Sequence, residues 1–225
     1  MGDERPDGFK GARVPSGIRF RRFTLYAVGF SIAGLGIGGL LQAHLGTDPF
    51  DAVNAGIGAH IGLAVGQCSW INASLVLLLA WLLGRRPKIG TVALVFFLGL
   101  MIDVGVAVLP RVSGLPGRGV EAALSLAALY LGLTSFVLSG IGAGCLEELM
   151  LSLVAKGFRL HRARWGIEVV LLALALVLRG PINVVTVLFV ALTGPVLSWS
   201  IPNLASLVRV PLPDHDPEIP LGDIR

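Results

Sequence analysis

The chain has few charged residues and little cysteine. Asp, Glu, Lys and Arg make up 14% of its 225 residues, against about 25% in a typical soluble domain. Hydrophobic residues make up 54%, more than a soluble protein of this size can bury, so we expect an integral membrane protein with one membrane domain. The two cysteines, Cys68 and Cys145, match no metal or redox spacing, and we expect neither a metal site nor a cofactor.

Enzyme motifs are also missing. The sequence has no HExxH, no GxSxG and no Ser/His or Cys/His arrangement suited to nucleophilic catalysis, so we do not expect an enzyme. The net charge is +4 and the basic residues lie at the ends of apolar runs. Nucleic acid is therefore not an expected partner, and the positive charge is expected to meet anionic headgroups of a lipid bilayer.

Six apolar runs have, or nearly have, the roughly 20 residues that a helix needs to cross a bilayer. They lie near 23–45, 68–84, 89–110, 120–143, 165–180 and 182–201. The sequence thus predicts an all-α membrane protein of about six transmembrane helices. The remaining segments are polar, basic or rich in Gly and Pro: the tails 1–22 and 202–225, the turn 85–88 and the linker 111–119.

Two further segments, 48–62 and 145–158, are too short and too polar to fit this pattern. Each is amphipathic at helical spacing. A charge at the bilayer centre costs roughly 3 kcal/mol or more, and segments this short cannot keep their charges at the membrane edges. We interpret both as short helices that re-enter the membrane or lie at its surface.

The distribution of basic residues favours cytoplasmic N- and C-termini in the cell membrane. With six spans, 15 of the 18 Lys and Arg residues fall inside and 3 outside. An eight-span alternative, in which both short segments cross, gives 14 and 4, so length and polarity decide between the two. In the six-span arrangement 111–119 is an external linker.

The chain repeats itself at a spacing of 95 or 96 residues, and we call residues so related paired positions. Asp51 pairs with Glu147 and Gly36 with Gly132, and further pairs follow one residue out of step: Trp70 and Trp165, Thr91 and Thr186, Gly99 and Gly194. The halves are 23–110 and 120–201. Because each holds three spans, an odd number, the sequence predicts two inverted three-helix repeats, an arrangement common among transporters, with the substrate site between the halves.

The paired acids define the candidate site. Asp48 is placed as an N-cap with Pro49 at the first helical position and Asp51 at the third, which predicts a helix start. Both carboxylates also suit the positive end of the helix dipole. Structural and functional roles for Asp51 and Glu147 remain open, and Asn54 is a further polar candidate for a substrate or ion-coupling site.

Other intramembrane polar residues have simpler explanations beside a functional one. Asp103, within the third span, is a functional candidate by its depth, or pairs with Arg111. Glu168 is expected to pair with Arg164 one turn earlier. Glycines of the first span, including Gly34 and Gly38, are expected to allow close helix packing.

Several motifs resemble the YczE/YitT-type family of bacterial membrane proteins. They read LGTDPFDAVNAGIG, GRRPKIGT, GLMID, GIGAG followed by ELML, and a late LTGP. The resemblance covers roughly residues 20–202. The positions that carry it are Gly46, Pro49, Asp51, Gly90, Thr91 and Asp103. It implies a multi-span membrane protein, and no substrate, since most members have no assigned activity.

The second half departs from the family pattern. Cys145 and Glu147 replace a small residue and an Asp, and the stretch 179–186 lacks the usual glycines. Two functions remain open. The first is a transporter-like permease for a small solute, supported by the repeat and its paired acids. The second is a non-transporting scaffold or auxiliary subunit that binds a membrane partner or a second copy of itself.

Overall fold

A computed structural model describes residues 16–211, whose regular elements are all helices, with no strand among these residues. The predicted all-α class is confirmed. Among these residues there are eight helices: α1 (Ser16–Ala43), α2 (Pro49–Ile61), α3 (Val65–Leu82), α4 (Ile89–Val108), α5 (Leu115–Ser139), α6 (Cys145–Ala155), α7 (Leu160–Val177) and α8 (Val184–Val208).

Five of these helices, α1, α3, α4, α5 and α8, are long and apolar enough to cross a membrane. The sequence predicted six, and the sixth, α7, falls short because Arg162, Arg164 and Glu168 lie in its first half. Helical structure also extends into both predicted tails, since α1 begins at Ser16 and α8 runs on to Val208.

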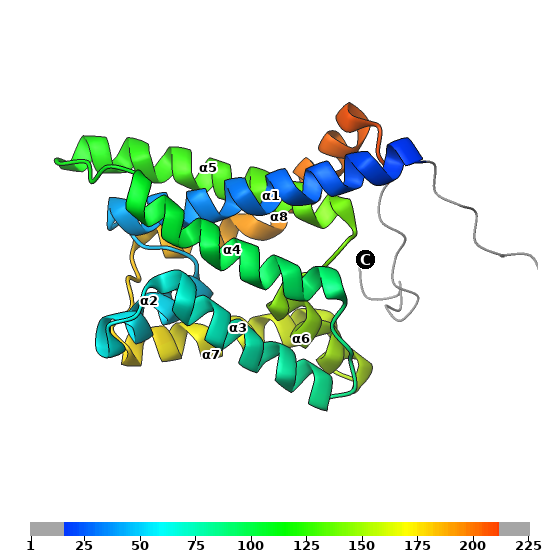
Figure 1. The fold of residues 1–225 in the computed structure, drawn as a ribbon. Helices are drawn as coiled ribbons and strands as arrows, with labels where there is room; N and C mark the ends of the chain where they lie inside the picture. Colours follow the sequence, from blue (N-terminus) through cyan, green and yellow to red (C-terminus); the bar gives the residue numbers. More distant parts are fainter. Residues whose placement is uncertain (1–15, 212–225) are drawn as a thin grey trace, which may run out of the picture.

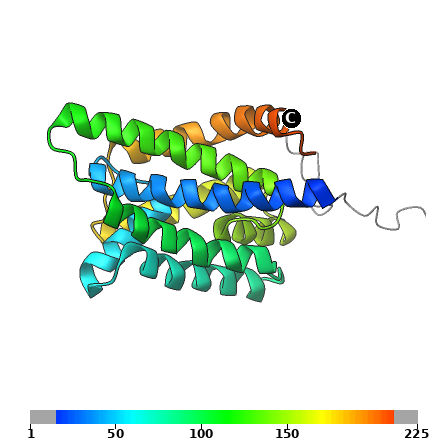
Figure 2. The same ribbon diagram turned by 45° about the horizontal axis from the view of Figure 1, so that its top comes forward.

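The helices form two layers. Figure 1 shows α1, α4, α5 and α8 in one layer and α2, α3, α6 and α7 in the other. Within the first layer α1 lies between α5 and α4 (Figure 2), and α3 packs against α4 to join the layers on one side. The predicted short helices α2 and α6 both lie in the second layer.

Glycines let α1 approach α5 very closely. A Cβ added to Gly29 would lie 2.6 Å from the backbone N of Phe136, and one added to Gly36 would lie 2.7 Å from that of Leu129. As the residue number increases along α1, the number of the facing residue in α5 decreases, so these two helices are antiparallel. On its other side α1 runs parallel to α4, with Gly38 against Gly105. The close packing predicted for the α1 glycines is confirmed.

The starts of the helices recur at the paired positions. Helices α2 and α6 begin at Pro49 and Cys145, 96 residues apart, while α3 and α7 begin at Val65 and Leu160, 95 apart. Helices α4 and α8 also begin 95 residues apart. Paired helices also make equivalent contacts. Helix α2 packs on α7, and their counterparts α6 and α3 pack on each other; likewise α1 packs on α4, and their counterparts α5 and α8 pack on each other.

Helix α2 does not cross from one end of the bundle to the other. The end of α1 and the start of α3 lie at the same end, since Gln42 contacts Val106 and Gly66 contacts Asp103, both late in α4. The 13 residues of α2 span about 20 Å, short of the roughly 30 Å hydrocarbon core. The chain therefore enters the bundle after α1 and returns along α2 to the same end.

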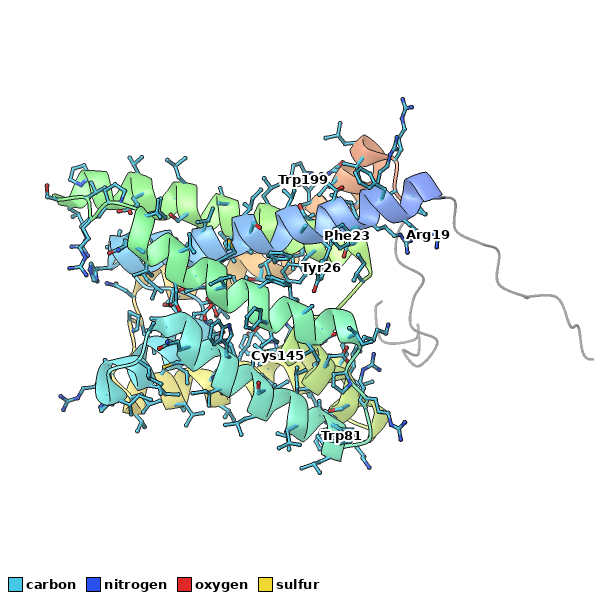
Figure 3. The ribbon with its side chains drawn as sticks, viewed as in Figure 1. Arg19, Phe23, Tyr26, Trp81, Cys145 and Trp199 are labelled. Atoms are coloured by element: carbon cyan, nitrogen blue, oxygen red, sulfur yellow. The ribbon has the colours of Figure 1, made fainter. Side chains whose placement is uncertain are left out.

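Basic residues gather at the opposite end. Arg21 near the start of α1 donates to the carbonyl of Val208 at the end of α8, and Tyr26 donates to the carbonyl of Gly90 just after the basic turn 85–88. The basic α6–α7 turn lies at this end too, because Arg85 contacts Glu148 of α6. We refer to it as the basic end, with Arg19 at its edge in Figure 3.

Replacing Gly38 by alanine should destabilise the protein. The added Cβ would lie 2.7 Å from the Cα of Gly105, against backbone that cannot rotate away, and overpacking of this kind costs about 1–3 kcal/mol. Gly166→Ala in α7 is the matched control, because nothing lies within 4 Å of its added Cβ. Thermal unfolding in detergent should show a lower Tm for Gly38→Ala alone; equal Tm values would contradict the close packing.

Candidate functional site

Helix α2 starts inside the protein with a capped first turn. The buried Asp48 is its N-cap and its Oδ1 accepts hydrogen bonds from the backbone N–H groups of Phe50 and Asp51, each at 3.1 Å. Pro49 at the first position has no N–H to satisfy. The predicted helix start is confirmed, and Asp48 has a structural role in it.

Asp51 lies at the end of a buried polar chain. Its Oδ1 accepts from the amide of Asn54 at 2.9 Å, and Asn54 in turn accepts from Asn72 of α3 at 3.0 Å. Asn54 is completely buried and Asp51 is 4% exposed. The carboxyl groups of Asp48 and Asp51 also lie within hydrogen-bonding reach of each other. This chain orients Asp51 and brings two acids together at one helix start.

The paired helix α6 starts differently. Its N-cap is Gly144, which has no side chain to accept a hydrogen bond. The carboxylate of Glu147 fills the place instead, since a Cβ added to Gly144 would collide with Oε2 of Glu147. Glu147 is exposed and lines a cavity. An acid thus covers the start of each short helix.

The two helix starts meet at a cavity of about 200 Å³. Asp48, Pro49 and Phe50 line it from α2, and Cys145 and Leu146 from α6. Figure 3 places Cys145 in the interior, between the two layers. Asp51 and Glu147, the two acids predicted from the repeat, both line this cavity, one from each short helix.

The cavity wall is built from paired positions of both halves. Nine pairs contribute both members: Ile37 and Leu133, Asp48 and Gly144, Pro49 and Cys145, Phe50 and Leu146, Asp51 and Glu147, Ser69 and Arg164, Ala73 and Glu168, Leu94 and Phe189, Leu98 and Thr193. The walls are mostly aliphatic and aromatic. Among the pairs from α3 and α7 the chemistry changes, because Ser69 and Ala73 in the first half correspond to the charged residues Arg164 and Glu168 in the second.

Charged groups in the wall are mainly acidic. Four carboxyl groups line the cavity, those of Asp48, Asp51, Glu147 and Glu168, against the guanidinium of Arg164. The expected pair of Arg164 with Glu168 is present, with Nε and Oε1 3.2 Å apart, and Arg164 also acts on Glu147 electrostatically. One guanidinium cannot balance the charge of four carboxylates, so a positively charged group would be stabilised in this cavity.

Asp103 lies elsewhere. Its carboxylate accepts a hydrogen bond from the backbone N–H of Gly66 at 2.7 Å, which caps the start of α3, and Asp103 is not part of the cavity wall. Arg111, proposed from the sequence as its partner, donates to Gln42 at 3.1 Å instead. The structure therefore gives Asp103 a capping role that its position in the sequence could not reveal.

Glu148 is an important acid that sequence analysis passed over. It is 2% exposed, and its Oε2 lies 2.6 Å from Nε of Arg85 in the α3–α4 turn. The hydroxyl of Thr91 donates to Oε1 at 3.3 Å and accepts from the backbone N–H of Ala143. The sequence feature that could have identified it as buried is its position on the same helical face as the apolar residues of α6. This network fixes α6 to the start of α4.

The last two helices of each half pack differently. We call the contact region between them a seam: α3 and α4 form the seam of the first half, and α7 and α8 that of the second. Helices α3 and α4 pack tightly: Trp70 stacks on Phe96 at 5.1 Å, and a Cβ on Gly99 would collide with the Trp70 ring. Helices α7 and α8 lack a comparable packed interface. Nothing lies within 4 Å of a Cβ on Gly194, the pair of Gly99, so Trp165 lies away from it. Both α7 and α8 line the cavity, which lies between them.

Sequence comparison now places the chain among known proteins. Residues 20–202 match the profile of DUF6198, a family of unknown function. The chain belongs to this family. It is 32% identical over 191 residues to the "Uncharacterized membrane protein YczE" of Bacillus subtilis, covering 84% of the chain and 89% of that relative. The resemblance drawn from the motifs to YczE-type proteins is confirmed.

Other members are more distant. The "Uncharacterized protein YyaS" of Bacillus subtilis is 29% identical over 188 residues, which is 80% of this chain and 92% of that protein. An "Uncharacterized protein" of Haemophilus influenzae is 22% identical over 194 residues, 86% of this chain and 89% of its own length. No solved structure matches the chain. Family membership and the apolar helices together establish a membrane protein.

Replacing Arg85 should destabilise the protein more than neutralising its partner Glu148. Arg85→Met leaves the carboxylate of Glu148 buried without its cation, which costs about 3–5 kcal/mol. Glu148→Gln removes the charge and keeps the shape, so we expect a smaller loss. Glu168→Gln breaks the more exposed pair and should cost at most about 1 kcal/mol. Thermal unfolding of the three variants checks this order, and a mild effect of Arg85→Met would contradict it.

Proposed function

We propose that the protein is a transporter-like permease that carries a small solute across the cell membrane by alternating access. The observation that supports this most is the cavity, because it lies where the starts of α2 and α6 meet and paired positions of both halves form its wall. Transporters with internal repeats place their substrate sites at the same kind of junction, beside the ends of partial helices.

The two halves, in this proposal, form an inverted repeat. The antiparallel packing of α1 on its counterpart α5 supports this, because a two-fold axis that relates antiparallel helices runs perpendicular to them. The basic end then faces the cytoplasm under the positive-inside rule. Helices α2 and α6 start near the middle and run to opposite ends, and α7 completes the second half despite its polar first turns.

The unequal seams define the two states of the transport cycle. In the present structure the seam of α3 and α4 is closed by Trp70 over Gly99, while the seam of α7 and α8 is open. Inverted halves exchange conformations when the site changes sides. In the other state Trp165 would lie over Gly194, and the α3–α4 seam would open.

Helix α8 has a bend point for this motion. Pro195 follows Gly194 directly within α8, and a proline inside a helix removes one backbone hydrogen bond and favours a kink. The part of α8 before Pro195 packs on α5 through Tyr130 stacked on Phe189, and the part beyond it through the hydroxyls of Thr134 and Ser200, 2.7 Å apart. A change of bend at Pro195 would exchange the second of these contacts for one with α7.

Sequence differences between the halves explain why the second seam is the open one. The pairs of Phe96 and Asp103 are Ala191 and Ser198, so a closed α7–α8 seam has neither the stacked ring nor the carboxylate cap that stabilises α3 on α4. Closure therefore depends on a further contribution, and a solute that touches both α7 and α8 supplies it by binding the closed state more tightly.

Cross-linking across the open seam should capture the other state. In a background with Cys68 and Cys145 replaced by alanine, we expect Trp165→Cys with Gly194→Cys to react with a short bis-maleimide. The rate should be about ten- to a thousandfold below that of a closed seam, as for a minor state populated at roughly 0.1–10%. Band shifts on denaturing gels measure it.

The first half provides the matched control. Trp70→Cys with Gly99→Cys tests the paired positions at the closed seam and should cross-link readily. If the Trp165/Gly194 pair never reacts while the control pair does, α7 and α8 are held apart permanently. That result would favour the second function, a scaffold whose partner occupies the open seam.

Cysteine labelling tests the orientation. A cysteine at Lys88, in the basic turn, should be shielded from a membrane-impermeant maleimide in intact cells and become reactive after permeabilisation. Gly119→Cys at the opposite end, where nothing lies within 4 Å of the added Cβ, should label in intact cells. External labelling at residue 88 would contradict both the cytoplasmic basic end and the six-span interpretation.

A further inference from the structure

The cavity has the chemistry of a site for a small organic cation. We infer that it binds a primary ammonium group attached to an apolar body of about one aromatic ring, with the ammonium at the acidic part of the wall, which Asp48, Asp51 and Glu147 line. This inference rests on the proposed function, because it names the class of solute that the same cavity would carry.

The first argument is charge. Helix starts normally attract anions, because their free N–H groups and dipole are positive. Here the protein's own carboxylates already occupy both helix starts. Asp48 accepts hydrogen bonds from the first turn of α2, and the side chain of Glu147 folds back over the first turn of α6. An anionic solute would meet four carboxyl groups and one guanidinium that is already paired with Glu168.

The second argument is the pair of neighbouring acids. Asp48 and Asp51 are both more than nine-tenths buried, at 8% and 4% exposure, and their carboxyl groups lie within reach of each other. Two carboxylates at such a distance repel strongly in surroundings of low polarity. Such a pair keeps both charges only with a cation beside it and otherwise holds a shared proton, so a cation bound here would take the place of that proton.

The third argument is an unused polar group. Ser69 is 4% exposed, lines the cavity, and makes no hydrogen bond with any residue that the structure describes. Because Ser69 borders the cavity, its hydroxyl is available to a ligand. An ammonium group has three N–H donors, so one that binds a carboxylate of this wall keeps a donor for a hydroxyl oxygen such as that of Ser69.

The walls and the volume set the rest of the ligand. Apart from the acids, the cavity is lined by aliphatic and aromatic side chains, among them Leu94, Leu133, Phe136 and Phe189. An apolar cavity of about 150 Å³ is known to accept benzene, so about 200 Å³ suits a ring with a short aminoalkyl chain. Phenylethylammonium has these dimensions and serves as the probe.

The experiment compares three probes of one shape on the purified full-length protein. We expect phenylethylammonium to bind in isothermal titration calorimetry and to raise Tm. Neutral 2-phenylethanol and anionic phenylacetate should bind at least about tenfold more weakly, because neither supplies the positive charge that would pair with the carboxylates of the wall. Equal binding of all three probes, or preference for phenylacetate, would overturn the inference.

Variants locate the ammonium group. Asp51→Asn and Glu147→Gln should each weaken binding of phenylethylammonium about tenfold or more, and Glu147→Gln serves alone if Asp51→Asn does not fold. Asp103→Asn is the matched control, because Asp103 lies outside the cavity and asparagine keeps an oxygen for the Gly66 N–H. Unchanged binding in both cavity variants would overturn the inference, as would an equal loss in the control.

The two proposals fail separately. Cross-linking between α7 and α8 needs no ligand, so it tests alternating access whatever the solute is. If that seam cross-links while phenylethylammonium does not bind, the solute class is wrong and the transporter proposal stands. If phenylethylammonium binds in the expected way while the seam never closes, the cavity is a cation site in a protein that does not transport by this motion.

Discussion

The need to satisfy two helix starts far from water determines most of this molecule. The first N–H groups of any helix have no partner within it, and at membrane depth each unsatisfied group costs several kcal/mol. Helix α2 meets this need with the side chain of Asp48, and α6 with Glu147. Acids are therefore required in the interior for structural reasons, and the character of the cavity follows from them.

A structural requirement and a functional capacity thus coincide in the same side chains. A cap needs only one acceptor at each helix start, and Asp48 already supplies it for α2. Asp51 is held by Asn54 and Asn72 in addition, which is more support than a second capping acid needs. Polar chains of this kind hold a side chain in one orientation, and that is the requirement of a binding site.

The sequence was sufficient for the features that depend on local or periodic information. Helix starts recur at the predicted spacing because each depends on residues next to it, as at Asp48 and Pro49. It was insufficient where a partner comes from a distant helix. Asp103 caps a helix 37 residues before it, and Glu148 pairs with Arg85 across 63 residues. The same limit explains α7, whose Arg164 and Glu168 line a cavity that only the assembled fold creates.

Differences between the halves carry more information about mechanism than their likeness. In a perfectly symmetric inverted repeat the two end states would have equal energy, and neither would be favoured without a gradient or a ligand. Here Phe96 and Asp103 hold one seam closed, whereas Ala191 and Ser198 leave the other without those contacts. Arg164 and Glu168 place an ion pair where the first half has Ser69 and Ala73. The second half thus lacks these seam contacts and carries more charge at the cavity, so in the proposed transport cycle a solute that entered by the open seam would meet these polar groups.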